Sequence, residues 1–289
     1  MSVGDLRRKF HRQIYEQVVR LSTNRKNNVQ YPNFADGTSR ASREIAWGIV
    51  SRLKTVETSQ PLSGQTVGAK FENITASFIE ETFQLLQHIR PGHWFYSTRY
   101  AISQFDQYEH LEHLDKFKKS TSDPLLASAL GEDYIIRPDI VIGRRLISEE
   151  EFNRLGEILS SDEEAASMTP LRAANAESSR PLLHASISCK WTIRSDRVQN
   201  ARTEALNLIR NRKGRLPHIA VVTAEPLPTR LAAIALGTGD VDCVYHFALH
   251  EMRAAIEEID NEDQMDMLDI MVQGKRLRDI SDLPFDLAM

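Results

Sequence analysis

Apolar residues in the first third of the chain recur at intervals of three and four positions, the spacing that places them on one face of an α-helix. This pattern predicts helices over residues 4–20 and 39–53, with Ser39 as a candidate N-cap of the second helix. A third, longer helical pattern ends before Pro91 and Gly92, two residue types that stop helices. The chain is therefore expected to begin as a helical region.

One acidic residue interrupts the apolar face of the third predicted helix. Glu72, Ala76, Ile79, Phe83 and Leu86 are spaced by four, three, four and three positions, so they share one side of the helix. We therefore expect the carboxylate of Glu72 to lie on the side that faces the core.

Segments rich in Ile, Val and aromatic residues predict strands in the rest of the chain. These segments cover residues 134–142, 182–192, 218–223 and 242–249. A helical pattern over 196–212, ended by Gly214, separates the second strand from the third. The alternation predicts an α/β fold with a central mixed β-sheet flanked by α-helices, and the length of 289 residues suits one domain over 1–289.

Composition narrows the class of protein. The chain is 41% hydrophobic and 26% charged, and no apolar run approaches the roughly 20 residues that cross a bilayer, so we expect a cytoplasmic protein with no membrane partner. Cys189 and Cys243 lie in predicted strands without zinc-ligand spacing, which predicts reduced thiols and no zinc. The net charge of -4 and the isoelectric point near 6.2 argue mildly against nucleic-acid binding through overall charge, although such binding depends on local phosphate contacts.

The predicted strand over 182–192 alternates strictly between apolar and polar side chains, which therefore point to opposite faces. The polar set is His184, Ser186, Ser188, Lys190 and Thr192. A solvent-facing edge strand would explain this pattern equally well, and His184 fits a hydrogen-bonded structural histidine better than a catalyst. A functional interpretation needs further residues.

Two more acidic residues occupy unusual positions. Asp139 follows Pro138 inside the apolar segment IIRPDIVI, where an ionised carboxylate needs a cation or hydrogen bonds to offset its desolvation. Glu204 lies in the middle of a predicted helix. Any one acid could be a structural salt-bridge residue, but Glu72, Asp139 and Glu204 together with Lys190 indicate a metal site. Carboxylates that hold Mg²⁺ beside a lysine that activates water suit phosphodiester hydrolysis.

These residues resemble the motif of the PD-(D/E)xK superfamily of type II restriction endonucleases. Pro138-Asp139 matches the first half of the motif and Ser188-Cys189-Lys190 the second. Ser188 takes the place of the second acid, and Glu204 on the next helix supplies an acid instead, as in the subgroup that recognises CCGG-centred sites. Matching segments span nearly the whole chain: LSGQT at 62–66, LQHIRPG at 86–92, PLLHASISCKWTIRSDR at 181–197, NRKGRLPHI at 211–219, VVTAEP at 221–226 and GKRLRDISDLP at 274–284.

The resemblance implies a restriction-endonuclease-like core with a defined catalytic set. That set would be Asp139, Lys190, Glu204, Glu72 and Ser188. Asp139 would bind both of two Mg²⁺ ions, and Glu204, Glu72 and the backbone carbonyl of Cys189 would be the other metal ligands. Lys190 would lie beside the attacking water. Similar enzymes act on double-stranded DNA in restriction-modification systems and form homotetramers as pairs of dimers, so the resemblance implies both.

Three charged residues that follow the predicted catalytic strand are candidates for reading DNA. Arg194, Asp196 and Arg197 stand four to seven positions after Lys190. In a first helical turn such side chains are usually solvated, and Asp196 also suits the positive helix N-terminus. In a major groove, however, each arginine can bind O6 and N7 of a guanine while the aspartate accepts from cytosine N4, which matches CCGG. The resemblance implies the target GCCGGC, cut as G/CCGGC to leave 5′ overhangs.

The resemblance assigns the outer base pair to a second group of residues. Asp36 and Arg230 would lie in the major groove, with Thr38 beside them, and Gln65 would lie in the minor groove. Thr38 replaces a serine of the family and keeps its hydroxyl. Asp36 with Gly37 is also an ordinary turn pair, and Arg230 could be an ordinary surface residue.

Two alternatives stay open at this point. The first is a nuclease of the same fold with a different CCGG-containing site, and the second is a DNA-binding protein of this fold that does not cut. The intact set of Asp139, Lys190 and Glu204 argues against the second.

Overall fold

The computed structural model describes residues 1–24, 28–53, 62–120, 136–160, 164–167, 169–172, 180–193, 195–237 and 239–289, without the side chains of 113–115, 117–119 and 195–198. The chain forms two compact units. Unit 1 comprises Met1–Arg90, Ile187–Ala205 and Ile219–Met289, and unit 2 comprises Pro91–Ser186 and Leu206–His218. That residues 1–289 act together as one catalytic and DNA-recognition domain stays a prediction.

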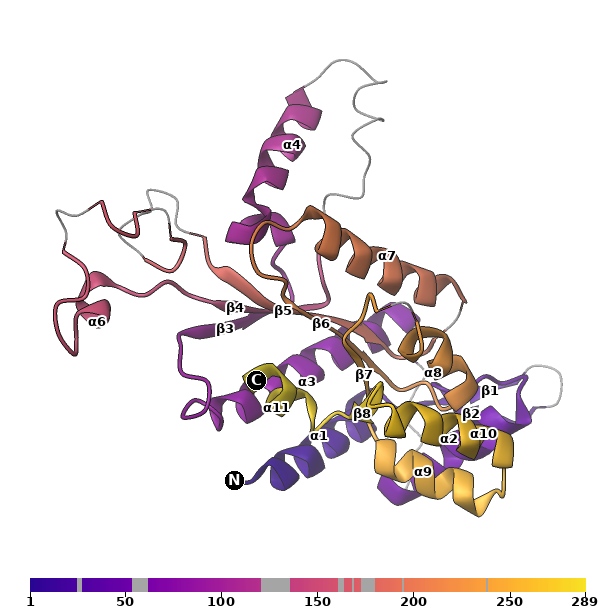
Figure 1. Cartoon of the computed structure of the whole chain (residues 1–289). Coiled ribbons are helices and arrows are strands. Elements are labelled where there is room, and N and C mark those ends of the chain that lie inside the picture. Colours follow the sequence, from indigo (N-terminus) through magenta and orange to yellow (C-terminus); the bar gives the residue numbers. More distant parts are fainter. Residues whose placement is uncertain are drawn as a thin grey trace. The chain divides into compact units, whose positions relative to one another are not determined.

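The main sheet is six-stranded, in the order β3-β4-β5-β6-β7-β8 (Figure 1). Its strands are β3 Trp94–Ser97, β4 Ile140–Arg144, β5 Leu182–Lys190, β6 His218–Thr223, β7 Cys243–His246 and β8 Leu277–Asp279. Strands β3 and β4 pair antiparallel, whereas β7 runs parallel to both β6 and β8. The predicted α/β fold with a mixed sheet and flanking helices is therefore confirmed.

Two predicted strands have different bounds in the structure. Strand β4 begins only at Ile140, because Pro138 has no N–H to donate to a ladder, so Asp139 precedes the strand instead of lying inside it. Residues 134–135 of that prediction lie outside the described residues. Strand β7 ends at His246, and Leu249 already begins a helix.

Unit 1 holds most of the helices and a small antiparallel sheet of β1 (Leu21–Thr23) and β2 (Gln30–Pro32). Its helices are α1 Val3–Gln17, α2 Arg40–Leu53, α3 Gly64–Gln84, α8 Pro228–Ala235, α9 Leu249–Glu258, α10 Glu262–Gln273 and α11 Leu283–Ala288. Helix α7, Ser195–Asn211, contributes to both units. The N-cap predicted for α2 is confirmed, since Ser39 Oγ accepts a hydrogen bond from Ser42 N at 3.2 Å.

An aromatic cluster in the core of unit 1 holds the residue that follows β5. The Trp191 ring lies 5.5 Å from the Phe34 ring, 5.1 Å from the Phe71 ring and 5.8 Å from the Phe247 ring, measured between centroids. Tilted and edge-to-face pairs of this kind contribute about 0.5 to 1.5 kcal/mol each beyond the burial of their area. The cluster therefore fixes the end of β5, where Lys190 lies.

Unit 2 contains β3, β4, the first part of β5, the short helices η1 (Ile102–Gln104) and η2 (Asp106–Tyr108), and the helices α4 (Glu109–Ser120) and α6 (Glu149–Phe152). The Gln107 side chain acts as a strand partner there. Its Nε2 donates to Leu183 O at 2.8 Å, and its Oε1 accepts from Leu183 N at 2.9 Å. This amide satisfies both backbone groups at the start of β5.

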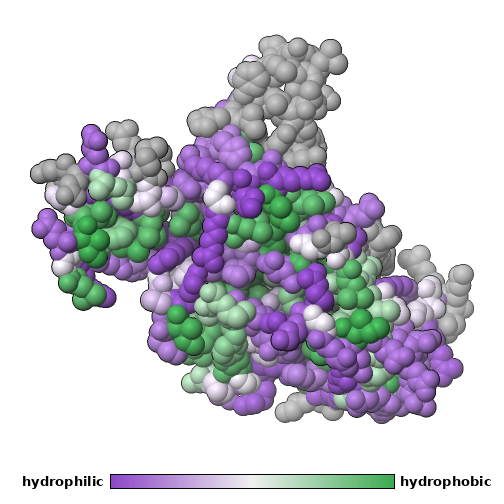
Figure 2. Space-filling view, viewed as in Figure 1, coloured by the Kyte–Doolittle hydropathy of each residue, from purple (hydrophilic) through white to green (hydrophobic). Residues whose placement is uncertain are grey.

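The surface carries both polar and apolar side chains. On the face shown in Figure 2, hydrophilic residues are interspersed with smaller hydrophobic groups, one of them over the segment around α6. Leu155 and Ile158 in that segment are 90% and 65% exposed. Within the described parts of the chain, no helix is both long and apolar enough to cross a membrane.

Candidate active site

Strand β5 carries the predicted catalytic lysine at its end. Every residue from Leu183 to Cys189 is buried, and Lys190 is half-buried. The polar face of the strand is buried as well, with Ser186 3% and Ser188 7% exposed. The alternative of a solvent-facing edge strand is therefore wrong, because both faces of this strand are covered.

The histidine on that face has a structural role. The His184 ring packs 4.7 Å from the Trp94 ring and 5.1 Å from the His218 ring, between centroids in unit 2. These ring contacts favour the structural interpretation of His184 over a catalytic one.

A cavity of about 1230 Å³ lies in unit 1 around the end of β5. It is lined by the loop between β2 and α2, the start of α3, the residues that follow β5, and part of α8. Lys190, Asp36, Thr38 and Arg230 all line it. The cavity thus brings the predicted catalytic lysine together with three of the residues predicted to read the outer base pair.

The predicted outer-pair readers form one interaction group in this cavity. Arg230 donates through Nη2 to Asp36 Oδ2, while Thr38 donates to Asp36 Oδ1 through its backbone N at 2.8 Å and its Oγ1 at 2.7 Å. Burial raises the pKa of the Asp36 carboxyl, but the bonds from Thr38 and Arg230 outweigh it and bring the pKa to about 2. Asp36 is therefore an ionised acceptor near neutral pH.

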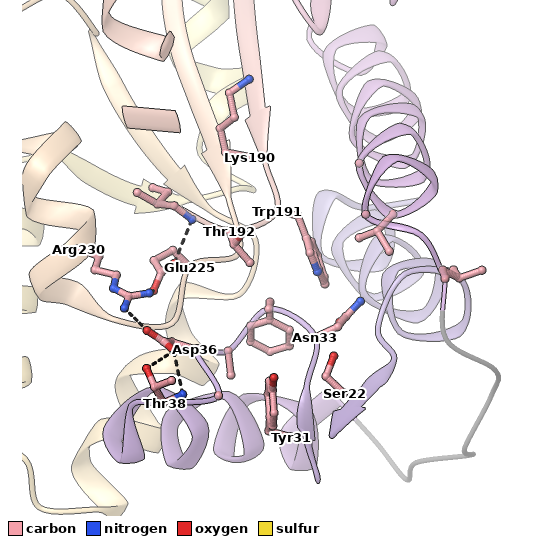
Figure 3. A pocket seen from close by; sticks show the side chains of 18 of the residues that line it. Ser22, Tyr31, Asn33, Asp36, Thr38, Lys190, Trp191, Thr192, Glu225 and Arg230 are labelled. Atoms are coloured by element: carbon pink, nitrogen blue, oxygen red, sulfur yellow. Dashed lines mark hydrogen bonds and ion pairs between the residues drawn. The ribbon is translucent and has the colours of Figure 1, made fainter. Parts of the chain in front are cut away.

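A second carboxylate completes this group and was missed by the sequence analysis. Glu225 is only 1% exposed, and its Oε1 lies 3.8 Å from Arg230 Nη1. Its Oε2 accepts from Ile193 N at 3.0 Å. Burial raises the pKa of Glu225 to about 7. Figure 3 shows Glu225 beside Arg230, with Asp36 and Thr38 beyond it. The signal was present in the sequence, since Glu225 interrupts an apolar segment just as Asp139 does.

The predicted metal ligands lie in different parts of the fold. Glu72 on α3 and Glu204 on α7 belong to unit 1, whereas Asp139, which directly precedes β4, belongs to unit 2. All three are half-buried, so the prediction that Glu72 faces the core holds only in part. Among the described residues, no three His, Cys, Asp or Glu side chains form a group that could hold a metal ion. Carboxylate oxygens are nevertheless the donors that Mg²⁺ prefers, and this ion takes only one or two of them together with waters and substrate phosphates.

Comparison with known proteins identifies the family. The NgoMIV restriction enzyme family matches residues 10–289 of this chain. The type II restriction enzyme NgoMIV of Neisseria gonorrhoeae is 51% identical over 288 residues, which cover 98% of this chain and 97% of that enzyme. The chain belongs to the NgoMIV restriction enzyme family. It is accordingly a type II restriction endonuclease, a site-specific deoxyribonuclease.

Solved structures with lower similarity come from other restriction endonucleases. The type IIF enzyme Bse634I with cognate DNA is 14% identical, with 90% of this chain and 99% of that chain covered and a TM-score of 0.36. The PspGI complex with substrate DNA is 13% identical, with 99% and 92% covered and a TM-score of 0.32. The family assignment rests on the sequence matches alone.

The other predicted site residues differ in their burial and in their distance along the chain from the cavity-lining segments. Ser188 is buried within β5, and Cys189 lines the cavity. Gln65 is exposed on the first turn of α3, where its neighbours Gly64 and Val67 line the cavity. The residues predicted to read the inner bases are only partly described. Arg194 lies outside the described residues, and for Asp196 and Arg197 only the backbone, in the first turn of α7, is described.

Proposed function

We propose that this endonuclease cleaves double-stranded DNA at the CCGG-centred palindrome GCCGGC, as G/CCGGC with 5′ overhangs, in a Mg²⁺-dependent hydrolysis. The observation that carries the proposal is the cavity of unit 1, which Lys190, Asp36 and Arg230 line together. A basic group suited to activating water therefore lies in the same space as an acid and an arginine suited to reading a base pair. The 51% identical relative NgoMIV is a type II restriction enzyme, which supports site-specific cleavage of DNA.

The inner bases would be read from the start of α7. Two arginines and one aspartate, Arg194, Arg197 and Asp196, match two guanines and one cytosine of CCGG through bidentate bonds to O6 and N7 and acceptance from N4. Because these residues follow Lys190 by four to seven positions, reading and cutting would share one segment of backbone.

The outer pair would be read by the group in the cavity. Arg230 offers donors for guanine, and the ionised Asp36 offers an acceptor for the cytosine amino group. Gln65, exposed on α3, would contact the minor groove. Thr38 would hold the Asp36 carboxylate in place through its two hydrogen bonds.

The carboxylates of Asp139, Glu204 and Glu72, with the backbone carbonyl of Cys189, would hold Mg²⁺, with two ions per active site. The bound metal would offset negative charge on the phosphate and lower the pKa of a bound water molecule. Lys190 would orient that water or take a proton from it through its Nζ atom, and Ser188 would support the position of the strand end.

Assembly and location belong to the same proposal. A homotetramer built as a dimer of dimers would need apolar surface, and Leu155 and Ile158 in unit 2 supply exposed apolar side chains. A cytoplasmic location would place the enzyme where incoming DNA is met.

The direct test is cleavage of a plasmid that carries GCCGGC, with run-off sequencing of the ends. We expect complete cutting after the first guanine in Mg²⁺, and binding without cutting in Ca²⁺. A plasmid carrying ACCGGT instead should stay intact under the same conditions. Intact GCCGGC plasmid at enzyme excess would contradict the proposal, and specific binding without any cleavage would support a non-cleaving DNA-binding protein instead.

A further inference from the structure

Glu225 is a buried acid whose two carboxylate oxygens contact different parts of the fold. Oε2 accepts from Ile193 N at 3.0 Å, in the turn between β5 and α7. Oε1 accepts from Leu227 N at 3.4 Å and lies 3.8 Å from Arg230 Nη1, at the start of α8. One side chain thus joins the turn that follows Lys190 to the helix that carries Arg230 (Figure 3).

We propose that Glu225 is a positioning residue for specificity, which orients Arg230 toward the outer base pair and ties that arginine to Ile193, in the turn that follows Lys190. The inference rests on the proposed function, because it assumes that Arg230 reads DNA. It adds a residue and a coupling to the catalytic and reading residues named above.

The geometry of the guanidinium favours this role. Arg230 uses Nη2 for Asp36 and turns Nη1 toward Glu225, so two acids hold one planar group from two sides. Asp36 is half-buried and lines the cavity, whereas Glu225 is 1% exposed. When a base replaces Asp36 as the partner of Arg230, the buried Glu225 can stay in place, since a guanidinium has five donors. A group held in its bound orientation before DNA arrives loses less entropy on binding.

The backbone around Glu225 makes a second tie to the catalytic strand. Ala224 N donates to Lys190 O at 3.4 Å, and Glu225 N donates to Thr223 Oγ1 at 3.2 Å. Together with the Glu225 bond to Ile193 N, this segment contacts the chain at both Lys190 and Ile193. A displacement of Arg230 by a wrong outer base would therefore be transmitted, through Glu225, to the turn next to the catalytic lysine.

The test measures kcat/KM on four duplexes that share CCGG and differ in the outer palindromic pair, at about pH 8, where the Glu225 carboxyl is ionised. Glu225→Gln keeps an oxygen for Ile193 N but removes the charge that faces Arg230. We expect the preference for GCCGGC over the other three sites to fall about tenfold or more, as one lost discriminating contact predicts. Arg230→Ala should cause a similar loss, and the double variant should lose little more than either single one.

Matched controls separate positioning from stability. Glu251→Gln also neutralises a partly buried acid paired with an arginine, Arg7, but Glu251 does not line the cavity. It should lower the melting temperature and leave the outer-pair preference unchanged. If Glu225→Gln does not fold, Glu225→Asp serves instead, because a shorter carboxylate cannot reach both Ile193 N and Arg230, and the preference should again fall.

The outcomes distinguish this inference from the proposed function. A folded Glu225→Gln enzyme with the wild-type preference, or with equal losses at all four sites, would overturn the role of Glu225 and leave the proposed function standing. A wild-type enzyme that cuts none of the four duplexes would overturn the proposed function and this inference together. Should the wild type prefer another outer pair, the same comparison applies to that pair.

Discussion

Arg230 on α8 donates a hydrogen bond to the carboxylate of Asp36, which stands 194 positions earlier in the chain. In the absence of DNA each residue is therefore the partner of the other, and neither charge is left unpaired in the cavity. Reading a base pair requires the exchange of this ion pair for contacts with bases. A cytosine and guanine pair offers the N4 amino group as a donor for Asp36, and guanine O6 and N7 as two acceptors for a bidentate bond from Arg230. A pair without guanine lacks those two adjacent acceptors, so Arg230 loses part of its hydrogen bonding when such a pair is bound.

Arg230→Ala should weaken discrimination at the outer base pair by about 1 to 3 kcal/mol, because it should lower the cleavage of GCCGGC and leave the slow rate at sites with another outer pair unchanged. The measurement is kcat/KM for GCCGGC against sites with a changed outer pair. Arg253→Ala, which removes an arginine paired with Asp269 on the surface, is the matched control. An equal loss at every sequence would make Arg230 a phosphate contact instead.

Lys190→Ala and Asp139→Ala should each abolish cleavage and leave specific binding in Ca²⁺ measurable. The first removes the group proposed to act on the attacking water, and the second removes the proposed ligand of both metal ions. Binding by gel shift and cleavage of the same labelled duplex give the two readouts. Loss of binding in a folded variant would contradict the assignment of these residues to the cutting step.

Arg194→Ala should cost about 1 to 3 kcal/mol of discrimination at one guanine of the CCGG core. The expected signature is a relaxed preference at that single position in a binding series with each base varied in turn. Uniform weakening, with a smaller dependence of binding on salt, would instead indicate a phosphate contact.

Arg7 is the residue whose loss should destabilise unit 1 most clearly. Its guanidinium donates to Asp279 Oδ1 and Oδ2, both at 2.8 Å, and to Glu251 Oε1 and Oε2 at 2.9 and 2.7 Å. Burial raises the pKa of Asp279, but Arg7 and Ser281 bring it down to about 2. Arg7→Ala leaves that carboxylate buried and without its cation, so we expect the free energy of unfolding to fall by roughly 3 to 5 kcal/mol.

The neighbouring arginine supplies the control. Among the described residues Arg8 forms an ion pair with Asp5 alone, and its side chain is 72% exposed. Arg8→Ala should change the denaturant midpoint very little. Similar losses for the two variants would show that the buried network contributes no more than an exposed pair.

Glu225 should also make stability depend on pH. Its pKa is raised to about 7 by burial, so the protonated form is favoured in the folded state. The resulting stability is present below the unfolded pKa of about 4.5 and is lost as the pH rises through about 7. Between pH 4.5 and 7 the free energy of unfolding of the wild type should fall by about 3 kcal/mol relative to that of Glu225→Gln. Above that range the difference between the two proteins should stay constant. Urea unfolding of both proteins at several pH values measures this difference, and parallel profiles would refute it.

The prediction from sequence was accurate where local spacing determines structure. The helices of the first third, the Ser39 cap and the βαβ order around β5 all follow from intervals of two, three or four residues. Helical spacing also singled out Glu72, and the apolar neighbours of Asp139 singled out that acid. Glu225 also lies among apolar residues, in the matching segment VVTAEP, but it was not assigned a role.

The sequence alone therefore determined the elements, the family and most of the candidate residues, because periodicity and motif are properties of neighbouring positions. Only the tertiary structure decided that both faces of β5 are buried, since alternation reports where side chains point and not what covers them. It alone joined Asp36 to Arg230 and Arg230 to Glu225. Ion pairs between segments far apart in the chain depend on the path of the backbone, and no local pattern encodes that path.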